Sequence, residues 1–255
     1  MANVLIGATG SVAAVRVPDL FDSLTRAGHA VKIVATTAAT YFFDPTEVGK
    51  NPSPPPPLRR EGLSDVGAPQ VLTAREGSAP PPFLGEGVGG RGDVFLDEDE
   101  WPGRSAGERY QRGDSVLHVE LRKWANIFAI APLDANTLAK LAVGLCDNCL
   151  TCVWRVWDVA RPVVFAPAMN TLMWQHPFTR RHLRTIAADA GAGHIPAHLA
   201  DDTLIQQIND RSPTLRVVPP VSKQLACGDA GVGALADVAD IVNAIQFMLG
   251  RAQAA

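Results

Sequence analysis

Long apolar runs are missing from this sequence, and so are the other marks of a membrane-bound or secreted protein. No run reaches the roughly 18 to 20 residues that a membrane-spanning helix needs. The N-terminus carries neither the charged region nor the cleavage site of a signal peptide. Only four cysteines occur in 255 residues, too few for a disulfide scaffold. We therefore expect a cytoplasmic protein whose thiols are reduced.

An excess of positive charge is also absent. The sequence has 23 Lys and Arg against 26 Asp and Glu, a net charge of -3. Because the basic residues form no run, neither a nucleic-acid partner nor a membrane partner is expected. Hydrophobic residues make up 47% and charged residues 19%, which is typical of a globular protein with one sizeable core.

The first fifty residues predict a β-α-β unit. Residues 3–6 form a short apolar strand, 7–11 a glycine-containing turn, 12–27 a helix by apolar spacing, and 31–35 a second strand. A strand, a helix and a strand within about thirty residues indicate a parallel sheet with crossover helices.

Two stretches interrupt this pattern. Residues 49–93 contain proline runs at 54–57 and 80–82 and show neither helical nor strand periodicity. Such a composition buries too little apolar surface to offset the entropy of ordering, so we predict a disordered insertion there. A second irregular insertion is predicted at about 191–212.

The rest of the chain alternates strands with helices. Strands are predicted at 127–131 and 163–166, and helices at 136–143, 149–156, 182–188 and 236–249. This alternation predicts an α/β fold with a doubly wound, Rossmann- or flavodoxin-like parallel sheet in three α/β/α layers. We expect a single domain over residues 1–250 that contains the two insertions.

The turn after the first strand is a candidate anion site. Gly7-x-x-Gly10-Ser11 places backbone N–H groups and a hydroxyl at the start of a helix, where negative charge is favoured. The spacing matches neither the dinucleotide fingerprint nor a Walker loop. A tight turn without a ligand therefore stays an alternative for this segment alone.

Four further segments accompany this turn in order along the chain. They contain His118 at 116–125, Asp134 at 131–140, Asn170 at 166–174, and Cys227 at 225–234. With Gly10-Ser11-Val12, this set resembles the homo-oligomeric flavin-containing cysteine decarboxylases. Within them it is similar to the Hal3-like phosphopantothenoylcysteine decarboxylases. The resemblance covers nearly all of the chain outside the two insertions.

The resemblance implies a cofactor, a substrate and an assembly. FMN would lie between the subunits of a homotrimer, and no metal is implied. The reaction would be decarboxylation of 4'-phosphopantothenoylcysteine to 4'-phosphopantetheine in coenzyme A biosynthesis. His118 would be the base, Cys227 the acid, and Asn170 and Met173 would bind substrate. The residues implied to contact FMN are Gly10, Ser11, Val12, Thr36, Thr37, Phe42, Asp134, Ala135, Asn136, Thr137 and Ala168.

The chemistry suits these residue types. Loss of CO₂ leaves a carbanion, and a flavin that oxidises the thiol first creates an electron sink for it. A histidine can accept the thiol proton at neutral pH, and an asparagine amide can orient the carboxylate. Cys227 would return a proton to carbon, so it separates redox-neutral from oxidative decarboxylation.

Other interpretations stay open for these residues. His118 alone is compatible with a structural histidine, Asn170 with a helix cap, and Cys227 with a small packed side chain. Two rival functions are a Hal3-type inhibitor of a protein phosphatase and an oxidative peptidyl-cysteine decarboxylase. The first is disfavoured because His118 and Cys227 occur together, and the second because Cys227 is present. A flavin prenyltransferase of related fold lacks the His118 segment.

Three cysteines at positions 146, 149 and 152 have a spacing that resembles an iron–sulfur motif. A fourth ligand is missing, and the segment has helical periodicity, so no metal cluster is expected. Lys123 replaces an arginine that is common in the related segment, which weakens any bidentate anion contact there.

Overall fold

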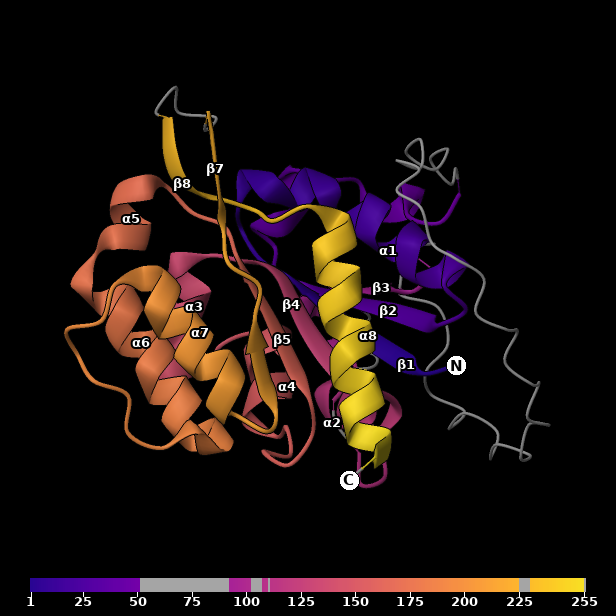
Figure 1. Cartoon of the computed structure of the whole chain (residues 1–255). Helices are drawn as coiled ribbons and strands as arrows, with labels where there is room; N and C mark the ends of the chain where they lie inside the picture. The colour runs from indigo at the N-terminus through magenta and orange to yellow at the C-terminus, as the bar shows by residue number, and fades with distance from the viewer. Residues whose placement is uncertain (51–91, 102–106, 110, 225–229, 255) are drawn as a thin grey trace, which may run out of the picture.

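A six-stranded parallel sheet forms the centre of the computed structural model, which describes residues 1–50, 92–101, 107–109, 111–224 and 230–254 (Figure 1). The strand order is β3-β2-β1-β4-β5-β6. The strands are β1 Asn3–Ala8, β2 Ala30–Ala35, β3 Val94–Phe95, β4 Ile127–Leu133, β5 Val163–Pro167 and β6 Leu215–Val217. All five strand pairs are parallel. The predicted doubly wound fold is confirmed, and its strand order is the Rossmann one.

Helices cover both faces of the sheet (Figure 1). One face packs against α1 Val17–Arg26, which follows the short 3-10 helix Val12–Arg16, and against α8 Val238–Ala254. The opposite face packs against α2 Leu117–Trp124, α3 Ala135–Val143, α4 Cys149–Arg155, α6 Pro177–Ala187 and α7 Asp201–Arg211. A short helix, α5 Thr171–Gln175, and an antiparallel hairpin of β7 Val221–Gln224 and β8 Ala230–Ala234 follow β5 and β6 in the chain.

Side-chain alternation along the central strands explains the two layers. In β1, Val4 and Ile6 belong to the core on the α1 and α8 side, whereas Leu5 belongs to the core on the other side. Successive side chains of a strand point to opposite faces. A strand buried on both faces therefore consists almost entirely of apolar residues, as β4 does.

The sheet edge beside the first predicted insertion differs from the expectation. Residues 51–91 lie outside the described residues, and the described chain resumes at residue 92 with a short strand. Strand β3 pairs with β2, and Asp93 beside it forms an ion pair with the buried Lys32 at 2.9 Å. Two residues are too few to show strand periodicity, so the sequence pattern missed β3.

The irregular structure predicted at about 191–212 is wrong, whereas the stretch as an insertion stays a prediction. Helix α7 occupies most of it and buries Leu204, Ile205 and Ile208 against the sheet. The Asn209 side chain anchors the edge strand: its Nδ2 donates to the Val217 carbonyl at 2.9 Å and its Oδ1 accepts from the Val217 N–H at 2.7 Å. Polar and charged residues fill the remaining positions, so the apolar period of this helix is weak. The domain extent of residues 1–250 stays a prediction.

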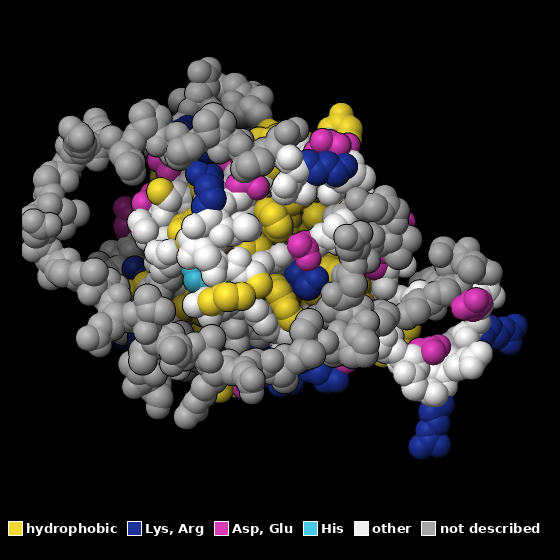
Figure 2. Space-filling model, turned by 90° about the vertical axis from the view of Figure 1, so that its right-hand side faces the viewer, with side chains coloured by type: hydrophobic (Ala, Val, Ile, Leu, Met, Phe, Trp, Pro, Cys, Tyr) yellow, Lys and Arg dark blue, Asp and Glu magenta, His cyan; other side chains and the backbone are white. Residues whose placement is uncertain are grey.

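The lengths of the helices and the character of the molecular surface bear on a possible membrane or nucleic-acid partner. No helix in the described part of the chain is long and apolar enough to cross a membrane. On the face shown in Figure 2, acidic and basic side chains lie among exposed hydrophobic ones, and neither charge dominates.

Replacing Phe128 tests how strongly the central strand supports the fold. Phe128 is fully buried in β4 and its ring centroid lies 5.4 Å from that of Trp157. Phe128→Ala should lower the free energy of unfolding by about 3 to 5 kcal/mol, because it removes buried apolar area and leaves a cavity. Chemical denaturation measures this change. Val143→Ala, at a position 72% exposed, should change it by less than about 0.5 kcal/mol; similar losses in both variants would contradict the packing described.

Candidate functional site

A cavity of about 480 Å³ opens beside the carboxyl ends of β1, β4 and β5. Strand order reverses between β1 and β4, and such reversals leave a crevice between the turns on either side. Nine of the predicted residues line it: Gly10, Ser11, Val12, Asp134, Ala135, Asn136, Ala168, Asn170 and Met173. The turns after three different strands thus come together.

Thr9 joins the turn after β1 to the turn after β4. Its buried hydroxyl donates to the Pro132 carbonyl at 2.8 Å and accepts from the Asp134 N–H at 2.8 Å. A hydroxyl that makes both bonds is fully satisfied despite its burial. The two turns therefore hold a single relative position at the cavity.

Asp134 also starts the helix that follows. Its Oδ1 accepts from the Thr137 N–H at 2.6 Å and so caps α3. Thr137 itself is buried and does not line the cavity, whereas the exposed Asn136 does. Capping therefore accounts for the pair Asp134 and Thr137, and leaves Asn136 as the side chain of this turn that faces solvent and cavity.

The glycine turn lies tightly against the turn after β2. A Cβ on Gly10 would be 2.6 Å from the Cβ of Ala38, so only glycine permits this approach. Thr36, at the end of β2, has a buried hydroxyl with no hydrogen-bond partner among the described residues. Thr37 donates weakly to Asp97 at 3.4 Å.

A buried hydroxyl without a partner is rare and usually has a partner that the chain does not supply. Thr36 lies next to the glycine turn that follows β1. A 3-10 helix begins directly after this turn, and the N-terminus of a helix favours phosphate. Ser11 stabilises that N-terminus by accepting from the Ala13 N–H at 3.3 Å. The residues present therefore fit a phosphate-bearing cofactor such as FMN.

The β7–β8 hairpin forms another wall of the cavity. The Met169 N–H donates to the Gly233 carbonyl at 2.9 Å, and a Cβ on Gly233 would lie 2.3 Å from the Met169 oxygen. Gly233 also has a φ of +147°, which favours glycine. This close approach brings the hairpin onto the turn after β5.

Lys223 of β7 also lines the cavity, although the sequence motifs did not predict it. Its Nζ lies 2.8 Å from Asp237, and the hydrogen bond and charge of Lys223 lower the pKa of that carboxyl. The position of Lys223, four residues before Cys227, could have predicted its place near the site. Cys227 lies outside the described residues, but Lys223 before it and Gly233 after it both line the cavity.

Asn170 combines two positions that the sequence left as alternatives. Its Oδ1 accepts from the Leu172 N–H at 2.8 Å and caps α5, and its side chain also lines the cavity. Met173, one turn further, is 54% exposed and reaches the same space. Helix α5 therefore presents both predicted substrate-binding residues.

His118 and Phe42 are not among the described residues that line this cavity. His118 lies in the first turn of α2, where its Nδ1 forms a short hydrogen bond with Glu100. Phe42 lies in a separate open depression near Leu96, with its ring edge-on to Tyr41 at 5.2 Å. A single copy of the chain thus does not bring every predicted residue together.

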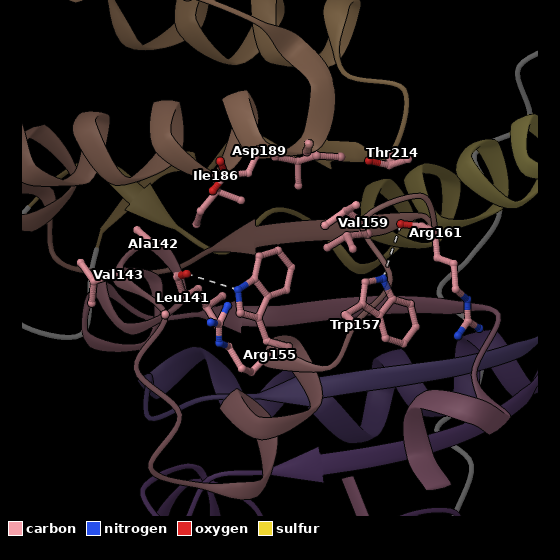
Figure 3. Close-up of a pocket in the computed structure, with 15 residues that line it drawn as sticks. Leu141, Ala142, Val143, Arg155, Trp157, Val159, Arg161, Ile186, Asp189 and Thr214 are labelled. Carbon is pink, nitrogen blue, oxygen red and sulfur yellow. Dashed lines mark hydrogen bonds between the residues drawn. The ribbon is translucent and has the colours of Figure 1, made fainter. Parts of the chain in front are cut away.

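A second cavity, of about 350 Å³, lies near the start of β5 and β6 and is drawn in Figure 3. Trp154 and Trp157 line it, and their indole N–H groups donate to the carbonyls of Leu141 and Arg161 at 3.2 and 3.4 Å. None of the predicted site residues lines this cavity. The candidate site is therefore the cavity at the carboxyl ends of the strands.

Two relatives of known name match nearly the whole chain. It is 37% identical over 249 residues to a phosphopantothenoylcysteine decarboxylase of Oryza sativa subsp. japonica, with 98% of this chain and 81% of the relative covered. It is 35% identical over 251 residues to a phosphopantothenoylcysteine decarboxylase of Mus musculus, with 98% and 88% covered.

Solved structures agree with these matches. A mutant PPC decarboxylase complexed with pantothenoylaminoethenethiol has a TM-score of 0.64 at 33% identity, with 96% of this chain and 97% of that chain covered. The FMN binding protein AtHal3 has a TM-score of 0.63 at 33% identity, with 96% and 95% covered. The family model described as Flavoprotein matches residues 1–250. The resemblance found in the sequence is confirmed, and the chain belongs to the Flavoprotein family.

Proposed function

We propose that this chain is an FMN-dependent decarboxylase that converts 4'-phosphopantothenoylcysteine to 4'-phosphopantetheine. The observation that carries the proposal is the cavity at the switch point of the sheet, where the turns after β1, β4 and β5 bring nine predicted residues together. The names of the rice and mouse relatives support the substrate. The similarity to AtHal3, an FMN binding protein, supports the cofactor.

FMN, when bound, would accept a hydride from the cysteine-derived carbon and later return it. Gly10, Ser11 and Val12 would bind its phosphate and ribityl chain at the helix N-terminus. The buried hydroxyl of Thr36 would gain a hydrogen-bond partner there, and Asn136 would approach the cofactor from the turn after β4. Gly10 lies so close to Ala38 that a residue with a side chain would not fit at this position.

Three side chains would carry the proton and binding steps. His118 would accept the proton of the substrate thiol as the carbon is oxidised. Asn170 would donate hydrogen bonds from its amide to the substrate carboxylate and so orient the bond that breaks when CO₂ leaves. Cys227 would donate the proton that the carbon takes up when the enethiolate is reduced.

The reaction itself is the first test. The purified protein should show flavin absorbance, and incubation with phosphopantothenoylcysteine should release CO₂ and phosphopantetheine in equal amounts. Absorbance spectra, CO₂ release and mass spectrometry of the product measure these outcomes. If the flavin-loaded protein releases no CO₂ from this substrate, the proposed reaction is refuted, whereas cofactor binding is still supported.

Cys227 decides whether the reaction ends reduced or oxidised. In Cys227→Ser, flavin reduction and CO₂ release should persist for a first turnover, because base and carboxylate-binding residues are unchanged. Formation of phosphopantetheine should stop, because a serine hydroxyl is a far weaker acid than a thiol. Single-turnover absorbance and product analysis separate the two steps. Cys146→Ser, at an exposed cysteine, is the matched control; normal turnover by Cys227→Ser would refute the proton-donor role.

We also propose that the active form is a cytoplasmic homotrimer with FMN between subunits. Two observations support the assembly. His118 is not among the described residues that line the cavity of its own chain, and large apolar side chains beside that cavity are exposed, among them Val12, Leu172 and Met173. Exposed apolar patches are typical of protein interfaces.

Complementation between subunits tests this assembly. His118→Asn and Asn170→Asp should each be inactive, but co-expressed chains should recover about a quarter of the wild-type rate, because random mixing of subunits rebuilds that share of sites between neighbours. Sedimentation gives the subunit number in the same samples. No recovery in mixed oligomers would show that His118 and Asn170 act within one chain.

A further inference from the structure

Glu100 is a buried carboxylate that the predicted chemistry does not use. It ends the 3-10 helix η4 (Asp97–Glu100), and its side chain is only 9% exposed. A carboxylate is rarely buried unless a hydrogen bond or charge partner compensates the lost hydration. The partner of Glu100 is His118.

The contact uses one nitrogen of the imidazole ring. Glu100 Oε1 forms a short hydrogen bond with Nδ1 of His118, whose side chain is 17% exposed. A carboxylate accepts and does not donate at neutral pH, so the proton of a neutral ring lies on Nδ1. Nε2 then carries the lone pair, and it is the nitrogen able to take a proton from a substrate.

Cys149 of helix α4 lies close to the same carboxylate. Burial raises the pKa of the Cys149 thiol, and the negative charge of the neighbouring Glu100 raises it further, so this thiol stays protonated beside the carboxylate. Glu100 Oε2 is buried and has no hydrogen-bond partner within the described ranges. No described cation forms an ion pair with Glu100, so His118 is its one charge partner among these residues.

Asp97, in the same 3-10 helix, is bound differently. Its Oδ1 accepts from the Cys149 N–H at 2.8 Å, and its Oδ2 accepts from Thr37 at 3.4 Å. Asp97 thus fixes η4 on the N-terminus of α4, while Glu100 is left to face α2. The two carboxylates of this helical turn therefore bind different elements, Asp97 the start of α4 and Glu100 the His118 ring of α2.

We infer that Glu100 is a positioning residue for His118, holding the proton on Nδ1 and directing Nε2 toward the substrate thiol. The identity of the substrate in this inference rests on the proposed function, and the geometry rests on the contact between Glu100 and His118. When the thiol proton moves to Nε2, the ring becomes an imidazolium and the Nδ1–H bond to Glu100 is retained. The neighbouring carboxylate stabilises this charge as it develops.

Three variants of the flavin-loaded protein test the inference. In Glu100→Gln the rate of flavin reduction by substrate should fall by roughly 100-fold, whereas KM should change little, because Glu100 does not bind substrate. Glu100→Asp keeps the charge on a shorter side chain and should recover part of the rate. Glu98→Gln, at an exposed position of the same 3-10 helix, should react as the wild type does.

A second measurement does not depend on turnover. Nitrogen-15 NMR of the histidine rings distinguishes a proton on Nδ1 from one on Nε2, and the His118 signal is assigned by its loss in His118→Asn. The wild type should carry the proton on Nδ1 at a pH where the ring is neutral, and Glu100→Gln should lose this preference.

The outcomes separate the inference from the proposed function. If the wild type fails to decarboxylate the substrate, the proposed function fails and the NMR result alone decides the role of Glu100. If the wild type reacts and Glu100→Gln reacts equally fast with an unchanged tautomer, Glu100 does not position His118. Should Glu100→Gln fail to fold, Glu100→Asp decides: a proton kept on Nδ1 with partly retained rate supports the inference, and a wild-type rate with the proton on Nε2 overturns it.

Discussion

One buried hydroxyl sets the geometry on which the candidate site depends. Thr9 links the Pro132 carbonyl to the Asp134 N–H, each at 2.8 Å, and thereby joins the turns that follow β1 and β4. Those strands are neighbours at the point where the sheet order reverses, so their turns diverge and a crevice forms between them. The Thr9 N–H adds a backbone hydrogen bond to the same Pro132 carbonyl at 3.3 Å. With these bonds, the glycine turn and the start of α3 face one cavity.

The other walls depend on close approaches of backbone to backbone. Gly10 permits the contact with the turn after β2, and Gly233 permits the β7–β8 hairpin to reach the turn after β5. In both places a Cβ would overlap a neighbouring atom, so glycine is required by packing. The hairpin thereby brings Lys223 and Gly233, both more than fifty positions beyond Asn170 in the sequence, to the same cavity. Segments distant in sequence thus meet because small residues let them approach.

His118 and Glu100 are not among the described residues that line this cavity. His118 lies in the first turn of α2 and Glu100 ends η4, and both of these elements pack against α4. The cavity and the histidine therefore occupy different parts of one chain. The hydrogen bond to the buried carboxylate of Glu100 involves Nδ1 of the ring and not Nε2.

The sequence alone determined the doubly wound fold, the β1 turn and the segments around Asp134 and Asn170. These features depend on interactions between residues close in the sequence. They are the periodic spacing of apolar residues, glycine at tight turns, and side chains that cap a helix within one turn of their own position. Strand β3, helix α7 and the partner of His118 were decided only by tertiary structure. The strand has two residues and is stabilised by pairing with β2, and the helix is stabilised by burying three apolar side chains among polar ones. Glu100 meets His118 across 18 residues of chain, and no local pattern records a contact that exists only when separate elements pack together.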